Sequence, residues 1–183
     1  TAADRTTLNT FPWPVAGAPA LFLAIASAEE CAPTGTSLIN RAEADAAVEV
    51  TCRLLQGGAS PADIGIITPY AGQAAHIKSK LSLRIGADVA AKSTVATTES
   101  FQGQERPFMV LSLVRTGAQL GFNTDARRLN VALTRARCGL VILGSPEALK
   151  RNAMFHALLL DFHKRGLLHH GNLGSLQPYA FRD

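Results

Sequence analysis

The sequence is poor in charge, in cysteine and in long apolar runs, and each shortage excludes a class of protein. Only 17% of its 183 residues are charged and 47% are hydrophobic, which excludes a disordered chain and suits one domain with a sizeable core. No apolar run approaches the roughly 18 residues of a membrane span, so we expect no membrane partner. The first residues lack a signal peptide and an initiator methionine, and we expect a fragment of a longer protein.

The cysteines are few and far apart. Cys31, Cys52 and Cys138 are odd in number, and no two have the close spacing of a zinc or redox motif. We therefore expect three free thiols, which fit the reducing cytosol or, as the alternative, the nucleus. A net charge of +4 and a pI of about 9.3 favour a polyanionic partner only weakly, because a solvated basic face is equally common.

The chain also lacks the residues that hold a nucleoside triphosphate in P-loop ATPases. No glycine is followed by lysine, so the phosphate-binding loop of P-loop ATPases is absent, and no Asp-Glu pair follows a strand to hold magnesium. His169 and His170 have no companion ligands, so we expect no metal site. The chain therefore cannot cradle a triphosphate by itself in the P-loop manner.

Short apolar runs alternate with helical patterns along the chain. This alternation predicts an α/β fold with a mostly parallel sheet covered on both faces, whose ligands bind in the loops after Thr68, Thr98, Val114 and Leu143. The expected strands are residues 21–26, 64–68, 93–98, 108–114 and 140–143. The expected helices are one from Asn40, capped by a box with Glu43 and ended by Gly57, followed by residues 73–83, 125–137 and 146–165.

We divide the chain into three parts. Residues 1–19 include a proline-rich stretch and form an N-terminal arm or linker. Residues 20–165 form the domain body, and residues 166–183 form a C-terminal tail that we expect to be peripheral.

An arginine-rich helical segment is the strongest functional signal. On a wheel of about 100° per residue, Arg128 and Arg135 lie on one shoulder of an apolar face, and Asn130 and Arg137 lie on the other. Guanidinium groups held on the edge of a packed helix suit a phosphate or carboxylate. A solvated basic helix is the alternative interpretation.

Two polar segments follow expected strands. Residues 97–105 combine hydroxyls, amides and carboxylates around Gly103, which suits contacts with phosphate or sugar, although a polar turn explains them equally well. Residues 68–73 include Tyr70, which could stack on a base or simply pack at an edge.

In order and spacing, residues 64–73, 100–105 and 121–139 resemble motifs IV, V and VI of superfamily 1 helicases, most closely those of the up-frameshift, nonsense-mediated-decay type. The resemblance covers nearly the whole chain, except residues 83–92 and the extreme C-terminus. It implies the second RecA-like lobe, a P-loop-NTPase-type three-layer sandwich, of a two-lobed motor that hydrolyses ATP and moves 5′ to 3′ along single-stranded RNA, or DNA. The P-loop and the Mg2+ site then belong to the first lobe.

The resemblance also implies roles for individual residues. Arg135 is the catalytic arginine finger at the γ-phosphate, and we expect it to be solvent-accessible and close to Glu105 and Tyr70. The implied nucleotide-binding residues are Tyr70 (stacked on adenine), Gln73, Glu105 and Arg135; those on the nucleic-acid phosphates are Thr68, Thr97 and Thr98; those supporting the motifs are Gln102, Gly103, Arg128 and Asn130. ATP and Mg2+ are the implied cofactors, and the first lobe and mRNA-decay factors are the implied partners.

Two departures keep other interpretations open. Ala74 stands where the most similar helicases have an arginine, and Glu99 stands where aspartate is usual. One alternative is a senataxin-like helicase lobe acting on DNA or RNA. The other is a non-catalytic module that binds RNA or a partner, which Ala74 favours and which the retention of Glu105 and Arg135 opposes.

The isolated chain should not hydrolyse ATP, because the phosphate cradle is absent. A coupled phosphate-release assay on the purified 183-residue chain is expected to give only the background rate, with or without single-stranded RNA. A steady ATPase rate that co-purifies with the chain would contradict the half-site interpretation.

Overall fold

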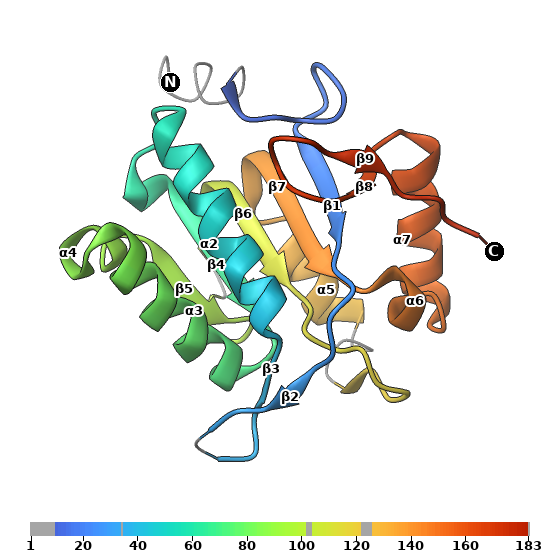
Figure 1. Cartoon of the computed structure of the whole chain (residues 1–183), viewed down its shortest axis with the longest axis horizontal. Coiled ribbons are helices and arrows are strands. Elements are labelled where there is room, and N and C mark those ends of the chain that lie inside the picture. Colours follow the sequence, from blue (N-terminus) through green and yellow to red (C-terminus); the bar gives the residue numbers. More distant parts are fainter. Residues whose placement is uncertain (1–9, 34, 102–103, 122–125, 183) are drawn as a thin grey trace.

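The computed structural model describes residues 10–33, 35–101, 104–121 and 126–182, and for residues 126–129 it describes the backbone alone. A seven-stranded sheet forms the centre in the order β5-β4-β6-β7-β1-β8-β9 (Figure 1). The strands are β1 Ala20–Ala24, β4 Ile64–Thr68, β5 Thr94–Thr97, β6 Arg106–Ser112, β7 Ala136–Gly144, β8 Leu168–His170 and β9 Gln177–Pro178. Neighbouring strands pair in parallel, except that β8 and β9 pair antiparallel with each other. This mostly parallel sheet confirms the predicted α/β class.

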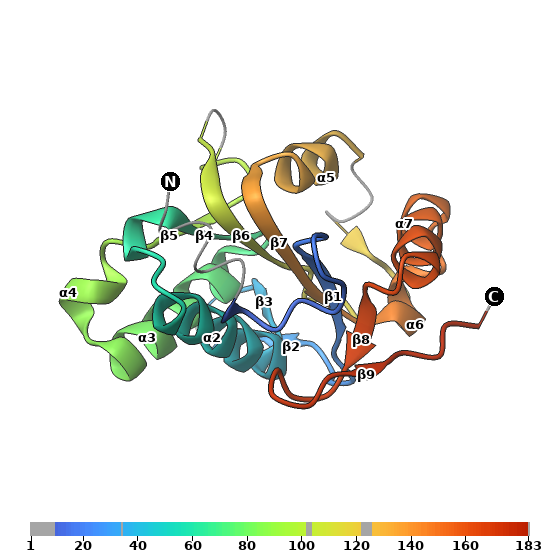
Figure 2. The same ribbon diagram turned by 90° about the horizontal axis from the view of Figure 1, so that it is seen from above.

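Helices cover both faces of the sheet (Figure 2). One face carries α2 Arg41–Gln56, the 3-10 turn η1 Pro61–Asp63, α3 Ala71–Ile85 and α4 Ala87–Ala90; the other carries α5 Ala126–Leu133, α6 Pro146–Leu149 and α7 Ala153–Lys164. A small hairpin of β2 Glu30–Cys31 and β3 Leu38–Ile39 follows β1. In the part of the chain that the structure describes, no helix combines the length and apolarity needed to cross a membrane.

Strand β4 shows why the sequence forms this sheet. All five of its residues are buried, because Ile64 and Ile66 pack under α2 and α3 while Ile67 packs into the opposite layer. Gly65 leaves room for the Phe101 ring: a Cβ added to Gly65 would lie 2.7 Å from the ring and 2.7 Å from Met109 Sδ. Phe101 thereby fixes the segment after β5 across this face of the sheet, so that it runs from one edge to the other.

Three expectations need correction. Strand β7 begins at Ala136, not at residue 140, because the ladder with β6 extends to the pair Arg106 and Ala136; Arg137 therefore lies on a strand and not on a helix shoulder. Asn40 does cap α2 by accepting a hydrogen bond from the Glu43 amide, but the Glu43 carboxylate binds elsewhere and completes no capping box.

The third correction concerns residues after Gly166, which are not peripheral. Strand β8 pairs with β1 inside the main sheet, and Leu167, Leu168 and Leu173 are each at most 5% exposed. The described part of the proline-rich N-terminal stretch packs on the core, where the Phe11 ring is buried and Trp13 lies against Gly139 of β7.

Filling the space above Gly65 should destabilise the fold. Gly65→Ala is expected to lower the free energy of unfolding by about 1–3 kcal/mol, because the added methyl overpacks the buried Phe101 ring. Gly174→Ala is the control, since its Cβ would meet only Arg53 at 3.8 Å and should change stability by less than about 0.5 kcal/mol. Urea denaturation measures both, and equal stability of the two variants would refute the packing argument.

Candidate nucleotide and nucleic-acid site

Three predicted threonines lie together at the carboxyl edge of the sheet. Thr68 and Thr97 end the neighbouring strands β4 and β5 in register, and the Thr98 amide donates to the Thr68 carbonyl at 3.2 Å. Thr97 Oγ1 donates to Ser100 Oγ at 3.1 Å. Thr68 and Thr98 are buried and Thr97 is half-buried, so Thr97 and the exposed Ser100 offer the accessible hydroxyls here.

Tyr70 lies at the same edge but inside the surface. Its side chain is 6% exposed, and its hydroxyl lies 3.0 Å from where a Cβ of Gly121 would stand, next to Arg115. The ring therefore packs among the loops that follow β4 and β6. This burial fits the edge-packed alternative, because the described conformation leaves almost no ring surface for an adenine.

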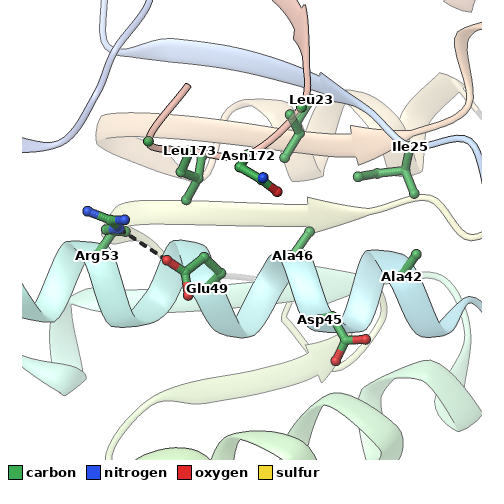
Figure 3. Close-up of a pocket in the computed structure, with 11 residues that line it drawn as sticks. Leu23, Ile25, Ala42, Asp45, Ala46, Glu49, Arg53, Asn172 and Leu173 are labelled. Atoms are coloured by element: carbon green, nitrogen blue, oxygen red, sulfur yellow. Dashed lines mark hydrogen bonds and ion pairs between the residues drawn. The ribbon is translucent and has the colours of Figure 1, made fainter. Parts of the chain in front are cut away.

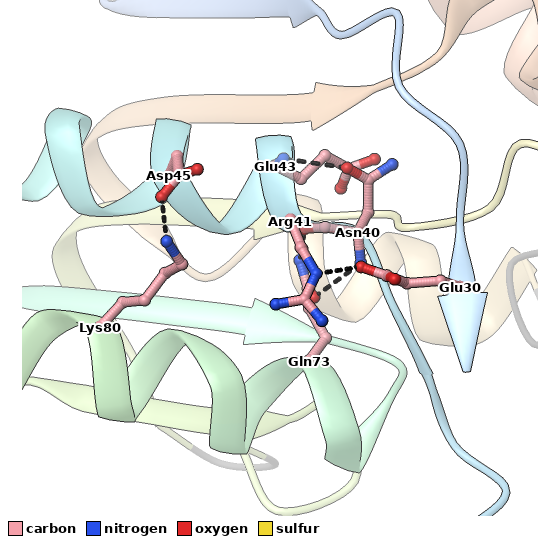
Figure 4. Close-up of polar contacts among 7 residues, drawn as sticks. All are labelled: Glu30, Asn40, Arg41, Glu43, Asp45, Gln73 and Lys80. Atoms are coloured by element: carbon pink, nitrogen blue, oxygen red, sulfur yellow. Dashed lines mark hydrogen bonds and ion pairs between the residues drawn. The ribbon is translucent and has the colours of Figure 1, made fainter. Parts of the chain in front are cut away.

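Gln73 belongs to a buried polar network (Figure 4). Its amide nitrogen donates to the Asn40 carbonyl and to Ser112 Oγ, each at 3.0 Å, and its oxygen accepts from the Asn40 amide at 2.9 Å. The side chain is 0% exposed. In this conformation Gln73 ties the start of α3 to the start of α2 and the end of β6, and it does not reach a ligand surface.

Glu43 completes the network, and the sequence did not reveal it. Its Oε2 accepts from Ser112 Oγ at 2.7 Å and from the Val114 amide at 2.9 Å, where Val114 has a φ of 68°. Complete burial raises the pKa of Glu43 to about 7, although the hydrogen bonds from Ser112 and Val114 oppose that rise. The available signal was its position on the apolar stripe of α2, in line with Ala47.

Two surface ion pairs flank this network. Arg41 binds Glu30 in β2, and Lys80 of α3 binds Asp45 of α2 (Figure 4). All four side chains are substantially exposed, so the pairs add little stability. They hold the hairpin and α3 against α2 at the carboxyl edge.

Glu105 and Arg135 lie at the opposite edge of the sheet. Each immediately precedes a strand, β6 or β7, and the Arg106 amide donates to the Arg135 carbonyl at 3.1 Å. Arg135 is half-buried, and its Nε donates to the Val131 carbonyl at 3.0 Å, near the end of α5. Glu105 is exposed.

The expectation that Arg135 lies near both Glu105 and Tyr70 therefore needs correction. Residues that precede parallel strands lie at the amino edge, whereas Tyr70 follows β4 and lies at the carboxyl edge. The structure brings Arg135 to Glu105 and separates both from Tyr70 and Gln73.

Arg106 orders the amino edge and was also missed. Its guanidinium donates to Thr94 Oγ1 at 3.0 Å, Gln104 Oε1 at 3.1 Å and the Glu105 carbonyl at 2.9 Å. It also lies 5.8 Å from the centre of the Phe101 ring. These contacts fix the backbone on either side of Glu105.

The supporting motif residues are only partly visible. Gln102 and Gly103 lie outside the described residues, as does the side chain of Arg128, whose backbone belongs to α5. Asn130 is exposed, and its carbonyl accepts from Thr134 Oγ1 at 2.7 Å. The supporting roles of these four residues stay predictions.

A separate groove lies on the α2 face, away from these residues (Figure 3). It has a volume of about 530 Å³ between α2, β1 and the loop Gly171–Gly174, with Leu23 and Leu173 among its apolar walls. Glu49 and Arg53 form an ion pair of 3.1 Å at its rim. None of the predicted site residues lines this groove.

Comparison with known proteins gives a consistent set of similarities. Residues 1–147 match a family described as AAA domain. The chain is 43% identical over 182 residues to the ATP-dependent helicase NAM7 of Saccharomyces cerevisiae. That alignment covers 97% of this chain and 19% of the yeast protein. The chain is 42% identical over 183 residues to the regulator of nonsense transcripts 1 homolog of Neurospora crassa, and 38% identical over 180 residues to that of Drosophila melanogaster.

The latter two alignments cover 97% and 96% of this chain but 17% and 15% of those proteins. The chain therefore spans less than a fifth of the length of these relatives. The similarity over almost the whole chain confirms the resemblance that motifs IV, V and VI indicated.

The buried Glu43 should make stability depend on pH. Its folded-state pKa of about 7 lies above the ordinary 4.5, so the folded protein holds the proton more tightly than the unfolded chain does. The resulting stabilisation is complete below about pH 4.5 and is lost as the pH rises to about 7, a fall of no more than about 3 kcal/mol.

Glu43→Gln should remove this fall, because the amide is neutral and keeps an oxygen for Ser112 and Val114. Glu49→Gln on the exposed side of the same helix should keep it. Denaturant unfolding from pH 4.5 to pH 8 tests both; a fall of wild-type size in Glu43→Gln would show that another group causes it.

Proposed function

The chain belongs to the AAA domain family, and from this premise we propose that it is the second RecA-like motor lobe of an ATP-dependent helicase of the nonsense-mediated-decay type. The whole motor would move 5′ to 3′ along single-stranded RNA. One observation carries the proposal: Glu105 and Arg135, thirty residues apart in the sequence, directly precede the adjacent strands β6 and β7, where the Arg106 amide donates to the Arg135 carbonyl at 3.1 Å.

The carboxyl edge is the proposed nucleic-acid track. Thr97, together with backbone groups near Thr68 and Thr98, would contact phosphates, and hydroxyl and amide donors of this kind position a strand without reading its sequence. Affinity for one lobe should be low and should fall with salt, because few phosphates are contacted. The same contacts accept DNA, so the senataxin-like alternative differs in substrate but not in geometry.

The amino edge is the proposed nucleotide side. One of the five N–H donors of Arg135 is bound to the Val131 carbonyl, which anchors the guanidinium at the end of α5. The remaining donors suit a γ-phosphate presented by another lobe, and Glu105 would contact the nucleotide beside it. An arginine that stabilises transition-state charge in this way contributes roughly 10³–10⁵ to the rate in related phosphoryl transfers.

ATP and Mg2+ would be held mainly by the other lobe. Within the described residues, the structure shows no group of three or more His, Cys, Asp or Glu side chains that could hold a metal ion. When bound, Mg2+ neutralises charge on the transferring phosphate. The proposed partners are that first lobe, single-stranded RNA and mRNA-decay factors, and the proposed location is the cytoplasm.

A second candidate function is a non-catalytic module that keeps the fold for RNA or partner contacts. Ala74 favours it, because this residue of α3 is 8% exposed and faces the apolar core. Gln73 and Tyr70, buried beside it, add no ligand contact in the described conformation.

Arg135 distinguishes the two candidates. In the two-lobed protein, Arg135→Ala should lower kcat for ATP by at least about 100-fold, and Arg135→Lys should restore little, because an ammonium lacks the planar fork. Arg137→Ala, an exposed position on β7, is the control and should stay within about twofold. The free energies of unfolding of the three variants should differ by less than about 1 kcal/mol. Near-normal turnover in Arg135→Lys would mean that Arg135 only caps α5.

A further inference from the structure

A cavity of about 730 Å³ lies at the carboxyl edge of the sheet, beyond the predicted track. The ends of β1 and β8, the start of α6 and the C-terminal segment surround it, including His170, Glu147, Lys150, Tyr179 and Arg182. We propose that this cavity binds one nucleotide unit of single-stranded nucleic acid, with the base on Tyr179 and the phosphate near Lys150 and Arg182. The inference rests on the proposed function and extends its track.

The Tyr179 ring is held in place before any ligand binds. Its hydroxyl donates to Glu147 Oε1 at 2.9 Å, and its ring meets that of His170 at an interplanar angle of 82° with centroids 6.2 Å apart. The ring is only half-buried, so a surface remains toward the cavity. A fixed aromatic ring is a stacking platform that loses little side-chain entropy when a base binds.

The cavity carries a positive excess. Lys150 Nζ lies 3.0 Å from Glu147 Oε2 and donates to the Arg182 carbonyl at 3.3 Å. Lys150 and Arg182 bring two positive charges against the one negative charge of Glu147, which leaves a net charge of +1 among these three side chains. Glu147 is thus already paired with Lys150 and Tyr179, and the excess charge suits a phosphate.

The size and the place of the cavity also fit a nucleotide. Its volume lies within the roughly 300–1,000 Å³ of small-molecule sites, and Ala24, Ile25 and Pro146 give it an apolar floor. Its strands end at the same edge as β4, because all of them run parallel. From β4 to β1 there are three strand spacings, about 14 Å, which an extended strand leaving the threonines can span in a few nucleotides.

The test measures the affinity of the 183-residue chain for oligouridylate that carries 2-aminopurine, whose fluorescence is quenched when it stacks. Tyr179→Leu should weaken binding roughly 5- to 100-fold and abolish quenching, whereas Tyr179→Phe, which keeps the ring, should retain most of both. Phe181→Leu is the matched control, because Phe181 contacts the rings of His156 and His163 outside the cavity. Lys150→Gln should reduce the slope of log affinity against log salt concentration by about 1, the amount expected when one phosphate contact is lost.

Thr97→Asp separates this inference from the proposed function, because it places a charge on the track itself. If Thr97→Asp weakens binding while Tyr179→Leu matches Phe181→Leu, the cavity assignment is overturned and the track stands. If the wild-type chain binds no oligonucleotide, both are overturned. Adenosine monophosphate that binds as tightly as the oligonucleotide would overturn the assignment to a strand.

Discussion

The hydrogen-bond ladder of β6 with both of its neighbours determines where Glu105, Arg135 and the start of α3 lie. At its amino end, the Arg106 amide binds the Arg135 carbonyl, which sets the place of motif VI relative to Glu105. At its carboxyl end, Ser112 joins Gln73 and Glu43, which sets the start of α3 and hence the loop after β4. One strand thus fixes the proposed nucleotide side at one edge and the proposed nucleic-acid side at the other.

Local pattern was enough for much of this fold. The five buried residues of β4 were predicted with the right bounds, and Asn40 was recognised as the cap of α2, because both features depend on neighbours in sequence. The change from helix to strand at Arg135 was not predictable in this way, since the ladder with β6 overrides local propensity. Strand β8 was not predicted for a similar reason, because its pairing with β1 joins segments far apart in the chain.

The structure brings some of the predicted site residues together and separates others. The threonines do gather at one edge, and Glu105 and Arg135 both lie at the other, because strand ends follow from strand ranges. The sequence analysis placed Tyr70 and Gln73 with the nucleotide, beside Glu105 and Arg135. Tyr70 and Gln73 follow a strand, whereas Glu105 and Arg135 precede strands, and the structure buries Tyr70 and Gln73 in the interior. Arg106 gave no motif signal, and the only motif signal from Glu43 was a capping box that does not form, because the partners of both side chains are non-local.

The division of one sheet into two ligand edges is most directly tested by amide chemical shifts. Oligouridylate is added to the uniformly 15N-labelled chain, and shift changes are followed residue by residue. Large changes should fall at the carboxyl edge, on Thr97, Thr98 and Ser100 as well as around Tyr179, while Arg106 and Arg135 at the amino edge should hardly move. Shift changes that concentrate on Arg106 and Arg135 and spare the threonines would contradict the account.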